Sequence, residues 1–419
     1  MTNGKTAVPL REYAQQEEAV TLKAAAYSRA VSPGPASKPE IKWIQALRGV
    51  ACILVVLCHA RYALSDTPYW ELAETLFRPG AAGVDLFFVI SGFVMTYTTW
   101  GHGRKDAASF LVKRFTRIWP PYAVLTLAWV ACFEGLQLLK SPDRLAVLAK
   151  SLGFVSVYPE APLYFGVTFP LGWSLEFEAY FYLVFALSLL FSRLRWIALG
   201  SWLVYSVLVF PMPRRGLNLD VAVNLGYSWS YANLVTNAIV LEFLFGVAVA
   251  MIYLSPLRLR SPRLCWNLLF LSVAVAAWYC YGGFFDYHGP QKWGIAAVLL
   301  VFGCAVASKT IEIRLPAPLL WLGTISYSLY LTHMLTQQIL SRLLPKFGYN
   351  VHSWGFIFLS TAAAIGAAYV FHELVEVRFS NLVRQGVDAL AVRVQRLRRR
   401  STLAVDLRVR EQRMRQSGP

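Results

Sequence analysis

The chain has 419 residues, of which 57% are hydrophobic and only 15% are charged, and its formal net charge is +17. Soluble domains carry about a quarter charged residues. The composition therefore excludes an ordinary soluble enzyme and predicts an all-α, polytopic integral membrane protein. Nucleic-acid binding is excluded as well, because the basic residues flank apolar segments and no recognition module accompanies them.

The six cysteines lie within or at the edges of apolar stretches, and none forms a C-x-x-C pair. They are interpreted as small buried hydrophobic residues, so neither disulfides nor a metal site is expected. The basic N-terminus is not followed by the apolar core of a cleaved signal peptide. The first span is therefore expected to direct the chain to the membrane.

Ten apolar stretches follow a polar N-terminal segment. Residues 1–40 end in the Pro/Gly-rich sequence SPGPASKPE, which predicts a mobile cytoplasmic tail. The predicted spans are 41–63, 81–100, 118–139, 171–192, 195–211, 232–254, 264–282, 291–308, 319–341 and 354–375. Together they form one predicted transmembrane domain, residues 41–377.

The distribution of basic residues predicts that both termini lie in the cytoplasm. An even number of spans keeps both Arg-rich ends on the side that the positive-inside tendency favours. Residues 378–419 contain VDALAVRVQRLRRR, in which apolar residues recur at helical spacing among arginines. This predicts a basic amphipathic tail on the anionic inner leaflet, or a topology anchor with no partner.

Arg48 and His59 lie eleven residues apart in the first predicted span. Eleven helical steps of about 100° return to within about 20° of the starting direction, so the two side chains share one face, about 16 Å apart. Such groups inside a membrane helix are costly and usually mark a pathway or a reaction centre. The spacing predicts one ligand held at both ends. The alternatives are a packed histidine at His59 and an arginine that snorkels to the headgroups.

Four spans are predicted to bring polar residues to one layer near the outer surface, namely His59, Asp85, Glu178 and His333. His59 is the predicted general base, and Asp85 or Glu178 is predicted to orient its ring. The alternatives are that Asp85 caps its helix and that His333 only bonds a neighbouring helix. Glu242, near mid-membrane, either lines a channel or pairs with another span.

A second polar group is predicted at the inner surface. Arg114 and Arg117 precede the third predicted span in KRFTRIWPPY, and Arg48 could join them. Arginine suits phosphate recognition because its guanidinium offers bidentate, charge-assisted hydrogen bonds. Anchoring by the positive-inside tendency explains Arg114 and Arg117 almost equally well. A channel between the two groups fits coenzyme A, which has a phosphate-rich head and a thin arm ending in a thioester.

Several ordered motifs carry a resemblance to a known family. They are Arg48 with His59, GVDLFF (Gly83–Phe88) with Ser91-Gly92-Phe93, Arg114 with Arg117, Trp173-Ser174-Leu175 with Glu178, ISYSLYL (Ile325–Leu331) with His333, and Glu376. The set resembles the acyltransferase-3 family of membrane-bound O-acyltransferases that act on bacterial surface glycans. The ending Glu376-Val377-Arg378-Phe379 departs from the expected Glu-x-Pro-Phe pattern, so no role is assigned to it.

The resemblance implies an acyl-CoA donor, with acetyl-CoA as the first expectation, and a glycan or lipid-linked sugar acceptor in a bacterial inner membrane. It suggests the shorter exopolysaccharide type. The expected catalytic residues are His59, Arg48, Asp85 and Glu178; Arg48, Arg114 and Arg117 would bind the donor, and Trp173, Ser174, Tyr330 and His333 the acceptor. Membrane lipids and a second copy of the chain are further expected partners. Two alternatives are a secondary transporter and a non-catalytic subunit of a polysaccharide export complex.

Overall fold

The computed structural model describes residues 40–389 except 162, 286 and 388. By internal contacts the chain separates into residues 1–40 and 41–419, and the second unit is described below. The predicted N-terminal tail before residue 40 and most of the predicted C-terminal tail lie outside the described residues. Within the described part, helices and their connections account for the whole structure, and no strand occurs. The all-α prediction is confirmed for these residues.

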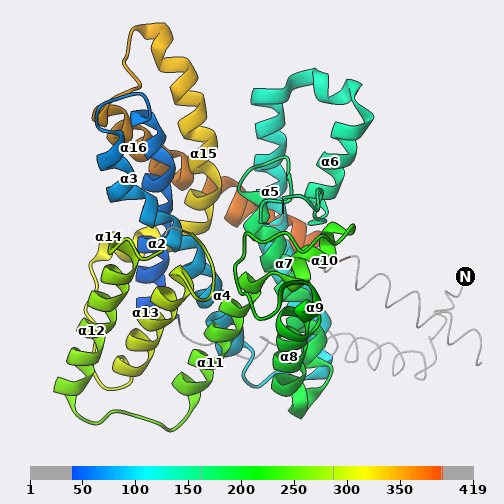
Figure 1. Ribbon diagram of the computed structural model, residues 1–419, viewed down its shortest axis with the longest axis vertical. Helices are drawn as coiled ribbons and strands as arrows, with labels where there is room; N and C mark the ends of the chain where they lie inside the picture. The colour runs from blue at the N-terminus through cyan, green and yellow to red at the C-terminus, as the bar shows by residue number, and fades with distance from the viewer. Residues whose placement is uncertain (1–39, 162, 286, 388, 390–419) are drawn as a thin grey trace, which may run out of the picture. The chain divides into compact units, whose positions relative to one another are not determined.

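Helices occur at every predicted span. They are α2 (Lys42–Ala60), α3 (Trp70–Phe77), α4 (Gly83–Thr98), α5 (Ala107–Trp129), α6 (Pro142–Leu152), α7 (Gly172–Leu189), α8 (Arg195–Val204), α9 (Met212–Arg215), α10 (Ser230–Thr236), α11 (Leu241–Leu254), α12 (Pro262–Tyr281), α13 (Trp293–Ala307), α14 (Ala317–Thr324), α15 (Ser326–Leu343) and α16 (Trp354–Phe371). Figure 1 shows α4 and α11 between two groups of helices, α2, α3 and α12–α16 in one and α5–α10 in the other.

Five helical stretches of the described residues are long and apolar enough to cross a membrane. They are Lys42–Leu64, Trp70–Thr98, Ser192–Arg215, Pro262–Tyr281 and Trp354–Val387. A sixth results if α10 and α11, which meet at a 44° bend, count as one span. Helix α13 is apolar but has only 15 residues, and α15 carries several polar side chains. The structure therefore supports a membrane protein, while the count of ten spans stays a prediction.

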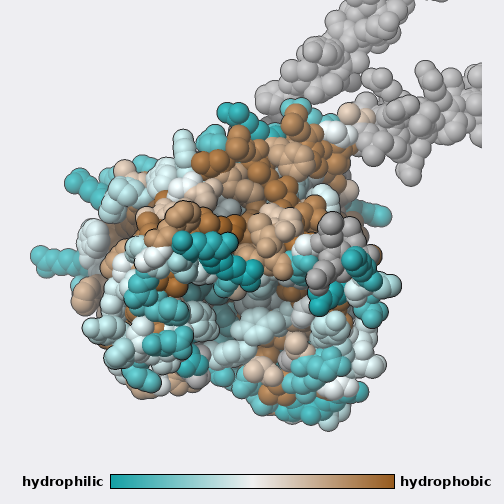
Figure 2. Space-filling model, turned by 90° about the horizontal axis from the view of Figure 1, so that it is seen from above, coloured by the Kyte–Doolittle hydropathy of each residue, from teal (hydrophilic) through white to brown (hydrophobic). Residues whose placement is uncertain are grey.

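The outward surfaces of several helices are apolar, as lipid contact requires. Ile197 on α8, Phe270 on α12 and Phe358 on α16 are each at least 66% exposed. Figure 2 shows hydrophobic side chains gathered on one side of the face seen from above, while hydrophilic ones border a hollow near its centre. Apolar surface of this extent is stable in a bilayer and not in water.

Glycines permit close backbone contacts in two pairs of helices. A Cβ atom at Gly92 of α4 would lie 2.0 Å from the carbonyl oxygen of Phe243 of α11, and one at Gly246 of α11 would lie 1.9 Å from that of Val89. A Cβ at Gly323 of α14 would lie 2.0 Å from the carbonyl oxygen of Gln45 of α2. Small residues of this kind let membrane helices pack backbone to backbone. They fix α2 and α4, which carry much of the site described below.

Three local features differ from the sequence expectation. Helices α3 and α6 lie in segments predicted to be loops. The sixth predicted span breaks at Asn237, whose extended backbone ends α10 and whose side chain accepts a hydrogen bond from the Ile239 N–H. Helix α5 begins at Ala107, before the predicted start at 118, so Arg114 and Arg117 lie inside it, and its two prolines are internal.

All six cysteines are free thiols in the structure. Four of them are buried, which agrees with their interpretation as small hydrophobic residues. Cys132 is exposed instead. It lies in the π-helical turn Val130–Glu134 that follows α5.

Candidate active site

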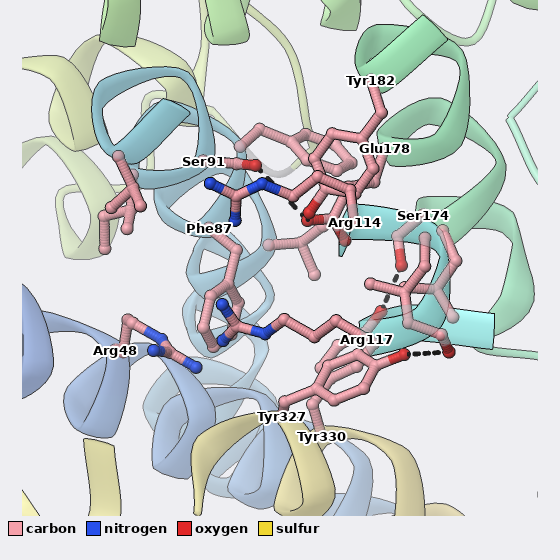
Figure 3. Close-up of a pocket in the computed structure, with 16 residues that line it drawn as sticks. Arg48, Phe87, Ser91, Arg114, Arg117, Ser174, Glu178, Tyr182, Tyr327 and Tyr330 are labelled. Carbon is pink, nitrogen blue, oxygen red and sulfur yellow. Dashed lines mark hydrogen bonds between the residues drawn. The ribbon is translucent and has the colours of Figure 1, made fainter. Parts of the chain in front are cut away.

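Three arginines surround a cavity of about 110 Å³ between α2, α4, α5, α7 and α15. We call it the arginine cavity. Its polar lining consists of Arg48, Ser91, Arg114, Arg117, Ser174, Glu178, Tyr182, Tyr327 and Tyr330. Figure 3 shows Arg48 and Arg117 extending toward each other across it. The structure thus brings together the three arginines that the sequence proposed for donor binding, and Arg48 lines the cavity.

The arginine cavity carries three cations against one carboxylate. The Arg114 guanidinium donates to Thr98 Oγ1 at 3.2 Å and lies over the rings of Phe110 and Tyr182. Glu178 accepts a hydrogen bond from Ser91 Oγ at 3.3 Å and another from the Tyr182 hydroxyl. Guanidinium groups are planar, carry several N–H donors and are positively charged, so a cluster of them with excess positive charge is suited to bind phosphate groups.

Glu376 lies near this cavity, although the sequence assigned the end of the tenth span no role. It belongs to the π-helical turn His372–Phe379 after α16. Its carboxylate accepts from Ser328 Oγ at 2.6 Å and contacts His372 Nδ1 at 2.9 Å. It also interacts electrostatically with Arg48 and Arg117. Glu376 thereby holds the last helix against the cationic wall.

A second cavity, of about 550 Å³, contains His59. We call it the histidine cavity. Its polar and aromatic lining consists of His59, Arg61, Tyr62, Arg78, Tyr164, Trp173, Tyr287, His288, Trp293 and Tyr330. Val84 and Tyr330 line both cavities. Because Arg48 and His59 come from one face of α2, that helix contributes to both cavities, and the two cavities meet at the Tyr330 ring.

Hydrogen bonds fix which nitrogen of His59 is available to a substrate. His333 Nδ1 faces the Leu329 carbonyl oxygen at 3.1 Å, so it carries the proton and leaves His333 Nε2 as an acceptor. That nitrogen lies 3.3 Å from His59 Nδ1, which also faces the Val55 carbonyl oxygen at 3.0 Å. His59 Nδ1 must therefore carry the proton. The lone pair of His59 Nε2 is left for a substrate, as a general base requires.

His333 was expected to bind substrate, and the structure places it behind His59. It is fully buried, and its ring centroid lies 5.1 Å from that of His59. It lies outside the set of residues that line either cavity. Its contact supports the interpretation that His333 bonds a neighbouring helix, here α2.

The structure corrects the expected partners of His59. Asp85 contacts His288 instead: the two atoms Asp85 Oδ2 and His288 Nδ1 are 2.7 Å apart. Asp85 Oδ1 also accepts the Gly289 N–H at 3.0 Å. Glu178 lines the arginine cavity and not the histidine cavity that contains His59. Neither carboxylate therefore orients His59 in this geometry, and that position belongs to His333.

The remaining predicted residues lie at the boundary of the two cavities. Ser174 Oγ and the Tyr330 hydroxyl are 2.7 Å apart, joining α7 to α15. Trp173 lines the histidine cavity, with its ring centroid 5.4 Å from that of His288. Toward the predicted outer side, Tyr164 and Tyr287 add phenol groups, and burial raises the pKa of both. These phenols therefore stay protonated near neutral pH.

Sequence reasoning missed His288. It lies in the segment between α12 and α13, which was interpreted as a connection. Two signals could have drawn attention to it: the chain has only six histidines, and loops of a rigid scaffold often carry functional residues. Glu242 is buried beside Asp85, the carboxylate that contacts His288. Its carboxyl approaches Asp85 from α11, so the pairing alternative for Glu242 agrees with the structure.

Comparison with known proteins places this geometry in context. The family profile described as "Acyltransferase domain" matches residues 41–373. The exopolysaccharide production protein ExoZ of Rhizobium meliloti is 30% identical over 303 residues, which cover 71% of this chain and 89% of that protein. The peptidoglycan O-acetyltransferase OatA of Listeria monocytogenes is 27% identical over 327 residues, which cover 71% of this chain and 49% of that protein.

A third relative is the putative membrane-bound transacylase BcsY of Komagataeibacter xylinus, 27% identical over 311 residues, covering 69% of this chain and 71% of that protein. No solved structure matches. The family profile covers most of the chain, and the similarity to the Rhizobium protein covers most of that relative. The chain belongs to the acyltransferase-3 family, as an O-acyltransferase with apolar helices that can span a membrane.

Proposed function

We propose that this protein transfers an acetyl or another short acyl group from cytoplasmic acyl-CoA to a hydroxyl group of a glycan or lipid-linked sugar on the far side of the inner membrane. In this proposal the domain crosses the membrane ten times and both termini are cytoplasmic. His59 is the general base. Arg48, Arg114 and Arg117 bind the donor.

One observation carries the proposal: a cationic cavity and a histidine-containing cavity share the wall formed by Val84 and Tyr330. The arginines would hold the phosphate groups of coenzyme A, and its thin arm would extend past Tyr330 toward His59. A charged phosphate group and a reactive thioester lie far apart on coenzyme A. The separation of about 16 Å between Arg48 and His59 along α2 suits such a ligand.

The geometry of His59 supplies the chemistry. Its Nε2 lone pair would take the proton of the acceptor hydroxyl as the oxygen attacks the thioester carbonyl carbon. The C–O bond forms, the C–S bond breaks, and the sulfur leaves with the bonding electron pair and takes up a proton from His59. The buried Nδ1 contacts keep the ring in the tautomer this step needs. Transfer through a transient acyl-histidine is a second route with the same residues.

Relatives with O-acetyltransferase names support an enzyme over a transporter or a structural subunit. The acceptor is proposed from names alone: an exopolysaccharide production protein and peptidoglycan O-acetyltransferases are among the relatives. Each of these names refers to a glycan, which supports a glycan acceptor for this chain.

The decisive experiment measures acyl groups on the surface polysaccharide by mass spectrometry in cells that carry the wild type, His59→Gln or Arg48→Ala. We expect one acyl group per repeat to disappear in both variants. His59→Gln removes a general base, which contributes about 10²–10⁴-fold in rate, and Arg48→Ala removes a charge-assisted contact to the donor. His352→Gln, on an exposed connection, serves as the matched control. Wild-type acylation by correctly inserted His59→Gln protein would refute the proposed role of His59.

A further inference from the structure

His288 is a second imidazole on the wall of the histidine cavity. It is only 6% exposed, and its Nδ1 lies 2.7 Å from Oδ2 of Asp85, which is fully buried at the start of α4. The other carboxylate oxygen accepts the Gly289 N–H. One carboxylate thus receives two adjacent donors from the segment that connects α12 and α13.

The polarity of these bonds determines what His288 presents to the cavity. Asp85 Oδ1 accepts the Gly289 N–H, and the His288 Nδ1 contact with Asp85 Oδ2 occupies one of the two ring nitrogens. With Nδ1 as the donor in that contact, Nε2 is the ring nitrogen left for a ligand. His59 has the same arrangement, with its Nδ1 proton directed to Val55 and His333. Two imidazoles that line the same cavity therefore each have an Nε2 atom left for a ligand.

Aromatic rings hold the His288 ring in place. The ring centroids of Trp173 and Trp293 each lie 5.4 Å from that of His288, and Trp293 is perpendicular to it. An imidazole fixed by a carboxylate and two indoles is preorganised, so little entropy is lost when it accepts a hydrogen bond. Anchoring of the connecting segment by Asp85 accounts for the Nδ1 contact. It does not account for the position of the ring on the cavity wall.

We infer that His288, oriented by Asp85, is an acceptor-binding residue that receives a hydrogen bond from one sugar hydroxyl while His59 faces the neighbouring hydroxyl. The site would then select a vicinal diol on one sugar unit over an isolated alcohol. This inference rests on the proposed function. Its physical reason is that an isolated alcohol satisfies one lone pair only, and an unpaired buried acceptor is costly.

The two hydroxyls have different fates in this arrangement. The hydroxyl that faces His59 gives its proton to His59 Nε2, its oxygen bonds to the acyl carbon, and the thiolate departs with the electrons of the C–S bond. The hydroxyl held by His288 keeps its proton and forms no covalent bond. His288 therefore affects which hydroxyl reacts and how well the acceptor is held.

The test compares acceptors that differ by a single hydroxyl. The protein in lipid nanodiscs receives acetyl-CoA and the methyl pyranosides of glucose, galactose or mannose, each alongside its monodeoxy analogues, and ester formation is measured. For the wild type we expect the parent glycoside to exceed the analogue that lacks the adjacent hydroxyl at least tenfold in kcat/KM. His288→Ala should bring this ratio close to one.

Two further variants separate hydrogen bonding from folding. His288→Gln keeps an acceptor oxygen and should retain part of the discrimination. Asp85→Asn keeps only one of the two oxygen atoms that contact His288 Nδ1 and the Gly289 N–H. It should therefore loosen the His288 ring and also reduce the ratio. His352→Gln is the matched control, because His352 approaches Asp66 at 4.0 Å in an exposed His–Asp pair away from the cavity. It should leave the ratio unchanged.

Each outcome decides between the alternatives. A His288→Ala protein that slows on every acceptor while the ratio stays at the wild-type value would show a structural anchor and overturn the inference. Wild-type protein that acylates its own polysaccharide but no glycoside of the panel would argue against recognition of one sugar unit. If cells that lack the chain keep all their acyl groups, the proposed function itself is refuted. That outcome is different from failure of the inference about His288.

Discussion

The arginine cavity and the histidine cavity hold their functional groups in different ways. Arg48 donates to Gln45 Oε1 at 3.4 Å and Arg114 donates to Thr98 Oγ1 at 3.2 Å, both neutral side chains, and both arginines line the cavity. His59 and His288 are fixed through Nδ1 by contacts of 2.7–3.3 Å. In the proposed function, the first cavity would select a ligand by its charge, whereas the second would select it by the direction of single hydrogen bonds. We therefore expect substitutions that keep the charge to be tolerated in the first cavity, and substitutions that keep a hydrogen-bond acceptor to be tolerated only in part in the second.

The largest effect should come from the hydrogen bond behind His59. In His333→Phe the His59 Nδ1 proton loses an acceptor, so the ring can adopt the unproductive tautomer. We expect kcat to fall about 10²-fold with the KM for acetyl-CoA unchanged, by analogy with other orienting partners. The measurement is steady-state transfer in nanodiscs. His333→Gln, which keeps an acceptor oxygen, should lose less. An unchanged kcat in the Phe variant would show that Val55 alone orients His59.

Arg117 tests the charge-selective cavity. Removal of one charge-assisted contact costs about 1.5–3 kcal/mol, so Arg117→Ala should raise the KM for acetyl-CoA by roughly tenfold to a hundredfold. Arg117→Lys keeps the charge and should lose much less. Added salt should raise the KM for acetyl-CoA by a larger factor in the wild type than in Arg117→Ala. The exposed Arg263→Ala on α12 is the control, and equal losses in both alanine variants would contradict donor binding by Arg117.

Gly246 tests the scaffold that supports both cavities. A methyl group there would meet the Val89 carbonyl oxygen, so Gly246→Ala should destabilise the fold by about 1–3 kcal/mol. Thermal unfolding in detergent measures this change. Gly200→Ala is the matched control, because a Cβ at that position of α8 meets nothing within 4 Å. Equal melting temperatures for the two variants would show that α4 and α11 separate easily.

The smallest effect should arise at the boundary between the cavities. Tyr330→Phe and Ser174→Ala each remove the hydrogen bond of 2.7 Å that joins their hydroxyls. Because a neutral hydrogen bond contributes about 0.5–1.5 kcal/mol, each variant should change kcat/KM only a few-fold. The double variant should be no worse than either single one. Additive losses in this cycle would show that the two hydroxyls act independently.

Helical geometry made part of the site predictable. The shared face of Arg48 and His59 follows from a spacing of eleven residues, and the structure places both on cavity walls. Depth was harder to judge. Glu178 was assigned to the same layer as His59, but it lies five residues beyond Trp173, which corresponds to about 7.5 Å along a helix. Trp173 therefore reaches the histidine cavity while Glu178 lies among the arginines.

The pairing of side chains could not be read from the sequence. Asp85 and His288 are separated by 203 positions, and the bond between them depends on how the segment after α12 folds back over α4. His333 likewise reaches His59 across 274 positions. Periodicity predicts which residues share one helix face, whereas contacts between helices depend on rotation and crossing that one sequence does not specify.

The wall shared by Val84 and Tyr330 has a consequence for the membrane itself. A bilayer stores an ion gradient, and a passage that opened to both sides at once would discharge it. If the acyl arm passes Tyr330, the phenol has to turn aside for each turnover and return afterwards. The hydrogen bond between Tyr330 and Ser174 would then keep the passage closed to ions whenever no donor occupies it.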